Sequence, residues 1–191
     1  GNKKVIDFLI EGGLDGILVL GSAGEFPDLN EQERLDFFRF YAEYVNGRVE
    51  LLAGTGCIRY ADTLALSNAV YELGYTPMVI SPYYFEMDQE KLFVYYDRLA
   101  KDVKGDLYLY NFPPRTGHSI APETIRRLID ANPNIIGLKD SVSTPGHTNM
   151  VCRAVEGKPF TVYSGFDDQF LSNIANNGGG GCIGALSIIV P

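Results

Sequence analysis

The chain has 191 residues, of which 46% are hydrophobic and 21% are charged, and its formal net charge is −8. This composition predicts one globular domain with a substantial core rather than a disordered segment. The negative charge and the absence of a basic stripe argue against a nucleic-acid partner, and no apolar run reaches the roughly 18 residues that a membrane span needs.

Three widely spaced cysteines and two histidines limit the chemistry that this chain can perform. Cys57, Cys152 and Cys182 fit neither a disulfide framework nor a zinc pattern, so we expect free thiols in a cytoplasmic protein without a signal peptide. His118 and His147 offer little for a metal site or a serine–histidine triad. We therefore expect no metal and no other cofactor.

Short apolar runs alternate with helical patterns along the whole chain, after an opening helix around residues 5–10. Asn30 and Glu33 form the pattern of a capping box, and Gly74 is typical of a helix end. Helices are predicted from Asn30 onward and over residues 60–73, 89–103, 122–131, 148–155 and 170–176. Strands are predicted over residues 16–21, 49–54, 77–81, 106–110, 134–139, 160–164 and 181–190.

This alternation predicts an α/β fold with a parallel sheet, because each crossover helix must cover a sheet face. The strands are rich in Val, Ile and Leu, which is typical of strands buried on both faces. An open doubly wound sheet and a closed TIM (β/α)8 barrel both fit. The polar clusters that follow the strands favour the barrel, and no G-x-G-x-x-G sequence supports a dinucleotide fold.

The barrel pattern is incomplete, since seven strands are predicted where eight are needed. The chain opens inside a helix with no strand before it, and it stops at Pro191 with no covering helix. Exposed sheet edges would favour aggregation. We therefore expect residues 1–191 to form a single barrel domain that is part of a longer protein, with the first strand and the C-terminal helices outside this chain.

Lys139 ends the predicted strand 134–139 and is the strongest candidate for a reactive group. A lysine at a strand end usually extends its charge into solvent. In a dry pocket the charged form is disfavoured, the pKa falls, and the neutral amine can attack a carbonyl carbon.

Other polar clusters follow neighbouring strands, and each has a structural alternative. Residues 21–26 (Gly-Ser-Ala-Gly-Glu-Phe) form either an anion-binding nest or an ordinary tight turn. Tyr110 is either a proton relay or a packing aromatic, and Arg115, after two prolines, is either a carboxylate clamp or a surface charge. Asp167 and Asp168 are more typical of a helix cap than of a metal site, and residues 178–181 (four glycines) predict a close turn.

Taken in order, these motifs resemble those of the dihydrodipicolinate synthase/N-acetylneuraminate lyase family of class I pyruvate-dependent aldolases. The resemblance rests on residues 21–25 (Gly-Ser-Ala-Gly-Glu), 110–113 (Tyr-Asn-Phe-Pro), 137–140 (Gly-Leu-Lys-Asp) and 164–168 (Ser-Gly-Phe-Asp-Asp), and it extends over essentially the whole chain. It implies a TIM barrel, a homotetramer, and a Schiff-base lyase or synthase that acts on pyruvate and a small aldehyde or sugar acid.

The resemblance also assigns roles to individual residues. Lys139 forms the Schiff base, Tyr110 shuttles protons, and Ser22 takes the place of a relay hydroxyl. Tyr84 matches a tyrosine that reaches the site of a neighbouring subunit. The substrate-binding positions are Ser22 and Ala23 for the pyruvate carboxylate, Ile183 and Gly165 in the pocket lining, and Arg115 near a dicarboxylate.

Three functions remain open. Arg115 favours a 4-hydroxy-tetrahydrodipicolinate synthase, which condenses pyruvate with an aldehyde. Ala23, where the synthases typically carry a threonine, and residues 24–26 with 111–113 favour a 2-keto-3-deoxy-sugar-acid aldolase, which cleaves a 2-oxo acid. The incomplete barrel also allows a non-catalytic binding module that keeps the motif residues by descent.

Overall fold

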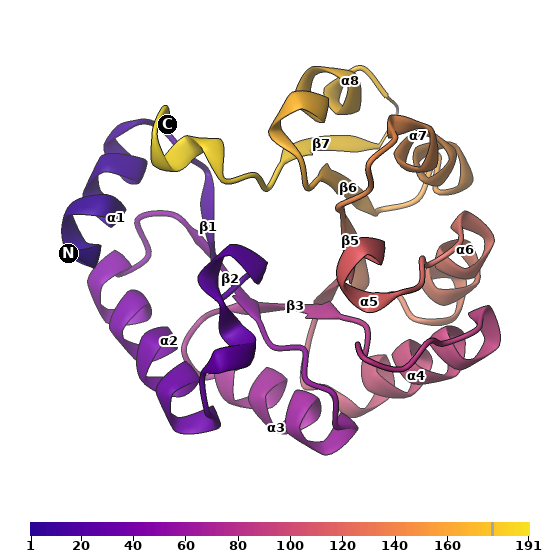
Figure 1. Cartoon of the computed structure of the whole chain (residues 1–191), viewed down its shortest axis with the longest axis horizontal. Coiled ribbons are helices and arrows are strands. Elements are labelled where there is room, and N and C mark those ends of the chain that lie inside the picture. Colours follow the sequence, from indigo (N-terminus) through magenta and orange to yellow (C-terminus); the bar gives the residue numbers. More distant parts are fainter. Residues whose placement is uncertain (177) are drawn as a thin grey trace.

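The computed structural model describes residues 1–176 and 178–191. Its seven strands form one parallel sheet in which spatial order follows sequence order. Figure 1 shows this sheet curled around a central space with the helices outside it. The strands are β1 (Gly16–Val19), β2 (Glu50–Gly54), β3 (Thr76–Ile80), β4 (Leu107–Asn111), β5 (Ile135–Asp140), β6 (Thr161–Ser164) and β7 (Gly179–Cys182). This is the architecture of a partial (β/α) barrel.

After α1, which precedes β1, the helices lie in the connections between successive strands, as parallel pairing requires. They are α1 (Asn2–Glu11), α2 (Glu31–Val45), α3 (Tyr60–Tyr71), α4 (Gln89–Asp102), α5 (Pro113–Thr116), α6 (Pro122–Ala131), α7 (Pro145–Ala154) and α8 (Phe170–Ile174). The described residues also form four 3-10 turns: η1 (Ser22–Gly24), η2 (Phe26–Asp28), η3 (Asp167–Gln169) and η4 (Leu186–Ile188). Among the residues described, every helix is too short or too polar to cross a bilayer.

The capping box at the start of α2 is confirmed. The Asn30 side chain accepts a hydrogen bond from the Glu33 N–H at 3.0 Å, and the Glu33 carboxylate accepts one from the Asn30 N–H at 2.9 Å. Such a cap contributes about 1 kcal/mol. Gly74 has a φ of +82° just after α3, which explains why that helix ends there.

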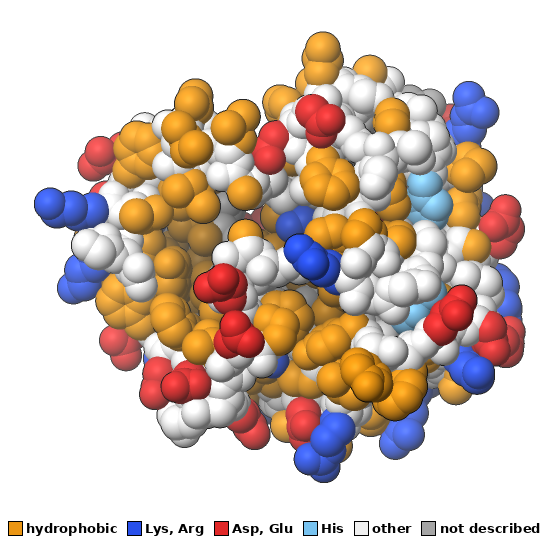
Figure 2. Space-filling model, in the orientation of Figure 1, with side chains coloured by type: hydrophobic (Ala, Val, Ile, Leu, Met, Phe, Trp, Pro, Cys, Tyr) orange, Lys and Arg blue, Asp and Glu red, His pale blue; other side chains and the backbone are white. Residues whose placement is uncertain are grey.

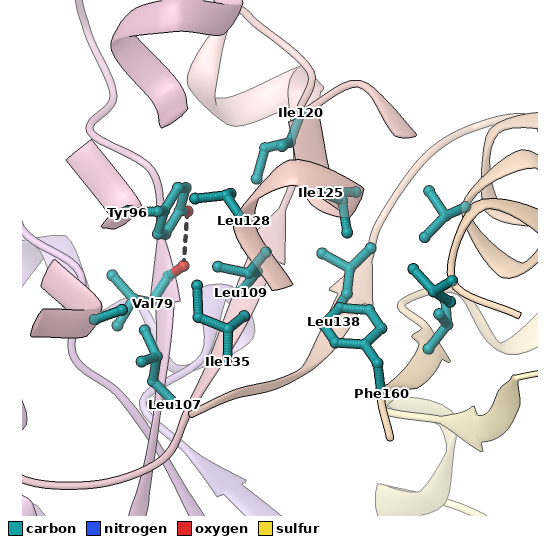
Figure 3. Packing of buried hydrophobic residues seen from close by; sticks show 14 of the residues in the cluster. Val79, Tyr96, Leu107, Leu109, Ile120, Ile125, Leu128, Ile135, Leu138 and Phe160 are labelled. Atoms are coloured by element: carbon teal, nitrogen blue, oxygen red, sulfur yellow. Dashed lines mark hydrogen bonds between the residues drawn. The ribbon is translucent and has the colours of Figure 1, made fainter. Parts of the chain in front are cut away.

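The core consists of two clusters of buried residues. One packs β3 to β6 against α4, α6 and α7, and it includes Leu109, Leu138 and Tyr96, whose hydroxyl donates to the Val79 carbonyl at 2.9 Å (Figure 3). The other packs β1 to β3 against α1, α2 and α3, and it includes Tyr108 and Tyr110 of β4. Successive residues of a strand face opposite sides, so each strand end presents one side chain to the inside and the next to the helices.

The prediction of a strand over residues 181–190 is wrong for most of its length. Only Gly179–Cys182 pair with β6, and η4 occupies Leu186–Ile188. The Asp167 carboxylate accepts hydrogen bonds from the N–H groups of Ala185 and Leu186, both at 3.2 Å, and this turns the chain away from the sheet. Asp167 therefore anchors η4 rather than capping its own helix, and the glycines predicted as a turn contribute most of β7.

Two elements after β4 and β5 also differ from the prediction. The loop after β4 contains the short helix α5, which begins at two prolines and ends at Gly117 with a φ of +77°. α7 begins at Pro145 instead of residue 148, because proline suits the first helical turn. This earlier start places His147 within α7, close to the end of β5.

Candidate active site

Tyr110 and Lys139 lie side by side at the carboxyl ends of β4 and β5. They are register partners in the sheet, and the Lys139 Nζ atom lies 4.8 Å from the centroid of the Tyr110 ring. Lys139 is 8% exposed and Tyr110 is 3% exposed. The amine is therefore buried against the ring face, as the sequence predicted for a reactive lysine rather than for a solvent-exposed one.

Burial changes the acidity of this amine. It lowers the pKa of Lys139 from 10.5 to about 8, against the opposing influence of Cys182 and Asp167. The tyrosine ring face also favours the ammonium form, but it does not replace the lost hydration. At pH 7 roughly one amine in ten is then neutral, compared with about one in 3,000 for an ordinary lysine. The neutral form is the nucleophile.

Tyr110 also contacts a hydroxyl in the turn that follows β1. The Tyr110 and Ser22 hydroxyl oxygens lie 3.2 Å apart. Burial raises the pKa of Tyr110, whereas the hydrogen bond with Ser22 and the positive charge of Arg115 act in the opposite direction. Tyr110 thus contacts Ser22 through its hydroxyl and Lys139 through its ring face.

The turn that carries Ser22 depends on an unusually close approach of two strand ends. Leu20 has a φ of +56° and Glu25 a φ of +53°, so both flanks of η1 are left-handed. A Cβ atom on Gly54 would lie 2.0 Å from the Leu20 carbonyl oxygen, and only glycine fits there. Ala23 lies exposed on the same turn, beside the partly buried Ser22.

The remaining substrate-binding candidates surround this group at different depths. Arg115 is exposed on α5, with its guanidinium 5.9 Å from the Phe112 ring, which in turn stacks on Tyr110. Gly165 donates its N–H to the Asp140 carbonyl, and a Cβ atom there would lie 1.9 Å from the Ser141 hydroxyl. Ile183 is partly buried against the core cluster that includes Tyr108 and Tyr110.

Tyr84 is not brought to this group. Its side chain is 82% exposed, its φ is +83°, and its ring centroid lies 4.9 Å from that of Phe85 in an edge-on arrangement.

Figure 2 shows the face of the molecule that surrounds the central hollow, where hydrophobic and basic side chains lie close together and acidic side chains lie at the edge.

A second polar group, which the sequence analysis did not predict, lies behind the catalytic candidates. The Asp140 carboxylate is fully buried and accepts hydrogen bonds from Asn111 at 2.7 Å, Thr148 at 2.8 Å and His147 at 2.9 Å. Strand alternation could have indicated it, because Asn111 and Asp140 each follow a predicted site residue. For His147, the sequence analysis weighed only a metal site and a serine–histidine triad.

A separate cavity of about 310 Å³ lies near η2, and sequence reasoning missed its buried cation. Arg34 lines this cavity together with Phe26, Cys57 and Tyr83. Its guanidinium donates to the Gly54 carbonyl at 2.7 Å and lies 5.1 Å from the Phe26 ring.

The chain is similar to known proteins over its whole length. The model of the dihydrodipicolinate synthetase family matches residues 1–191. YagE of Escherichia coli K12 is 37% identical over 194 residues, and the 4-hydroxy-tetrahydrodipicolinate synthase of Kosmotoga olearia is 36% identical over 191. These alignments cover 100% and 98% of the chain but 64% of each relative, so the chain spans less than two thirds of their length.

Solved structures give the same result. The crystal structure of YagE in complex with pyruvate superposes with a TM-score of 0.92 at 36% identity, covering 97% of this chain and 63% of that one. A 2-keto-3-deoxygluconate aldolase from Picrophilus torridus superposes with a TM-score of 0.91 at 26% identity, covering 98% and 67%. With its whole length matched by the family model and its fold shared with family structures, this chain belongs to the dihydrodipicolinate synthetase family.

Proposed function

We propose that this chain is the main part of a pyruvate-dependent lyase or synthase that works through a Schiff base at Lys139. The observation that carries the proposal is the buried Lys139 amine, with its lowered pKa, over the Tyr110 ring. Family membership and the pyruvate bound to YagE support the choice of substrate. The complete protein is a single cytoplasmic TIM barrel that needs no cofactor.

The chemistry follows from a neutral amine next to two hydroxyl groups. The Lys139 nitrogen attacks the keto carbon of pyruvate, and loss of water gives a cationic imine. That nitrogen withdraws electrons, so the pyruvate methyl group loses a proton and the resulting enamine attacks an aldehyde. The reverse path cleaves a hydroxy-oxo acid. Tyr110 and Ser22 carry the protons between these steps.

The substrate is held by the groups around this pair. The main-chain N–H groups of Ser22 and Ala23 bind the pyruvate carboxylate, since consecutive N–H groups of a tight turn form an anion site. Gly165 and Ile183 line the pocket.

Trapping the imine tests this function. Borohydride added with pyruvate should leave one reduced pyruvate unit on Lys139, identified by peptide mass. Lys139→Ala should abolish the adduct, whereas Lys101→Ala, a change at an exposed lysine, should keep it. If the folded wild-type protein binds pyruvate reversibly but gives no adduct, the chain is a binding module instead.

The preferred partner of pyruvate is an aldehyde with its own carboxylate, as in a 4-hydroxy-tetrahydrodipicolinate synthase. Arg115 supports this choice, because an exposed guanidinium above the Tyr110–Phe112 stack is free to form a bidentate pair with a carboxylate. Arg115→Leu should then reduce condensation with aspartate semialdehyde far more than imine formation with pyruvate.

A 2-keto-3-deoxygluconate-type aldolase is the second candidate, supported by Ala23 and by the similarity to the Picrophilus enzyme. Cleavage of 2-keto-3-deoxygluconate that is unchanged in Arg115→Leu would favour it.

The complete protein is also proposed to be a homotetramer. Tyr84 and Phe85 support this, since two adjacent aromatic side chains that are 82% and 69% exposed form the kind of surface that a partner covers. In that assembly Tyr84 reaches the site of a neighbouring subunit. Sedimentation velocity of the wild type and of Tyr84→Ser would test this, with a shift of the variant to smaller species expected.

A further inference from the structure

A closed ring of four hydrogen bonds lies behind the ends of β4 and β5. The Asn111 side chain donates to Asp140 at 2.7 Å and accepts from the Ile120 N–H at 3.0 Å. His147 completes the ring, with its Nδ1 atom 2.9 Å from Asp140 and its Nε2 atom 3.0 Å from the Ile120 carbonyl. The ring joins two strand ends, α7 and the loop before α6.

The partners of His147 determine its protonation state. The Ile120 carbonyl can only accept a hydrogen bond, so Nε2 must donate. Asp140 already accepts bonds from Asn111 and Thr148, which makes it a carboxylate acceptor, so Nδ1 must donate as well. An imidazole that donates from both nitrogens carries a positive charge.

The surroundings of His147 favour that charge. Burial lowers its pKa, but the hydrogen bond and charge of Asp140, the Ile120 carbonyl and the charge of Glu123 on α6 outweigh burial and raise it. The Ser119 hydroxyl, 3.4 Å from Nε2, is uncharged and can accept from the same N–H.

The other histidine of the chain shows the opposite arrangement. His118 Nδ1 accepts a hydrogen bond from the Met87 N–H at 3.3 Å, so its proton lies on Nε2, which faces the Ser81 hydroxyl at 2.9 Å. Burial lowers the pKa of His118. His118 is therefore a neutral imidazole and serves as an internal reference.

We propose that His147 is a positioning residue for the Schiff-base site. As an imidazolium it closes the ring that holds Asn111 and Asp140 together, and each of these residues directly follows a member of the catalytic pair. Because Asn111 pairs with Asp140 as Tyr110 pairs with Lys139, fixing one pair fixes the register of the other. The link to catalysis rests on the proposed function, but the ring and its effect on Lys139 do not.

The protonation state can be observed directly. We expect 15N spectra of histidine-labelled wild-type protein at pH 7 to show protons on both ring nitrogens of His147 and on Nε2 alone for His118. With two histidines in the chain, His118→Gln assigns both signals. An unprotonated nitrogen on His147 would overturn the proposal, whether or not any variant folds.

The positioning role is tested through the titration of Lys139, followed by the 13C resonance of its side chain. His147→Gln cannot donate from both positions, so the ring opens and water reaches the amine. We expect the titration midpoint to rise by about half a pH unit or more. His118→Gln, the same change at the reference histidine, should leave the midpoint unchanged. An unchanged midpoint in folded His147→Gln would overturn the proposal.

These readouts separate this proposal from the proposed function. If pyruvate gives no adduct in the wild type, the Schiff-base function fails, while the 15N spectra and the Lys139 midpoint still decide the role of His147. If the adduct forms, His147→Gln should slow trapping at saturating pyruvate about tenfold per folded molecule, with little change in the half-saturating concentration.

Discussion

The two sides of the β4 and β5 strand ends differ in how completely their polar groups are paired. On the inner side, Tyr110 and Lys139 are buried with few partners, and burial moves both pKa values towards the neutral forms. On the outer side, Asn111 and Asp140 have close hydrogen-bond partners. A reactive side chain needs polar atoms that are not already paired. The next residue along the strand can then hold the strand end in place through its own hydrogen bonds.

This difference predicts that substitutions on the outer side lower the stability of the fold, whereas substitutions on the inner side lower the rate of the reaction. The largest effect is expected for Asp140→Asn, which places an amide against the donors of His147 and Thr148. We expect the free energy of unfolding to fall by about 3 kcal/mol in urea titrations at pH 7. Asp168→Asn, at an exposed carboxylate, should change the free energy of unfolding by less than about 0.5 kcal/mol. If Asp140→Asn and Asp168→Asn lowered the free energy of unfolding equally, the proposed difference between the inner and outer sides of the strand ends would be contradicted.

On the inner side, the free energy of unfolding should change in the opposite direction when the buried amine is removed. Lys139→Met should raise the free energy of unfolding at pH 7 by up to about 3 kcal/mol, because a buried amine whose pKa falls from 10.5 to about 8 disfavours folding. That penalty is complete below pH 8 and disappears as the pH rises towards 10.5. The gain should therefore shrink between pH 7 and pH 10, as urea titrations at both values can show. Lys4→Met, at an exposed lysine, provides the control, and a gain independent of pH would contradict the buried-amine account.

The smallest effect is expected at Ser22. Ser22→Ala removes the hydrogen bond to the Tyr110 hydroxyl, so the pKa of Tyr110 should rise further. We expect the initial rate of pyruvate trapping to fall about threefold to tenfold, while the free energy of unfolding changes by less than about 1 kcal/mol. Ser143→Ala, at an exposed serine after β5, should change neither. If the free energy of unfolding fell by more than about 1 kcal/mol while the trapping rate hardly changed, Ser22 would belong with the residues that support the fold.

Sequence patterns predicted the parts of this structure that depend on local rules. Alternating apolar runs located the β strands up to β6, and the Asn30–Glu33 pattern located the start of α2, because strand burial and helix capping act over a few residues. The buried position of Lys139 agrees with one of the two alternatives for a strand that ends in an amine. Its contact with Tyr110 followed from the expectation that polar strand ends meet at one edge of the sheet.

The remaining features depend on contacts between distant residues. The apolar run after Cys182 has the composition of a strand, yet Asp167 binds its main chain and prevents pairing. Likewise, the role proposed for His147 depends on its contacts with Asp140 and Ile120 in the folded chain. Periodicity and composition carry no information about such partners.

The central claim is that burial lowers the pKa of the Lys139 amine far below the ordinary lysine value, and its own titration tests this most directly. With 13C-labelled lysine, the difference between wild-type and Lys139→Met spectra assigns the resonance. The account predicts a titration midpoint at about 8. A midpoint near the ordinary lysine value of 10.5 would contradict it.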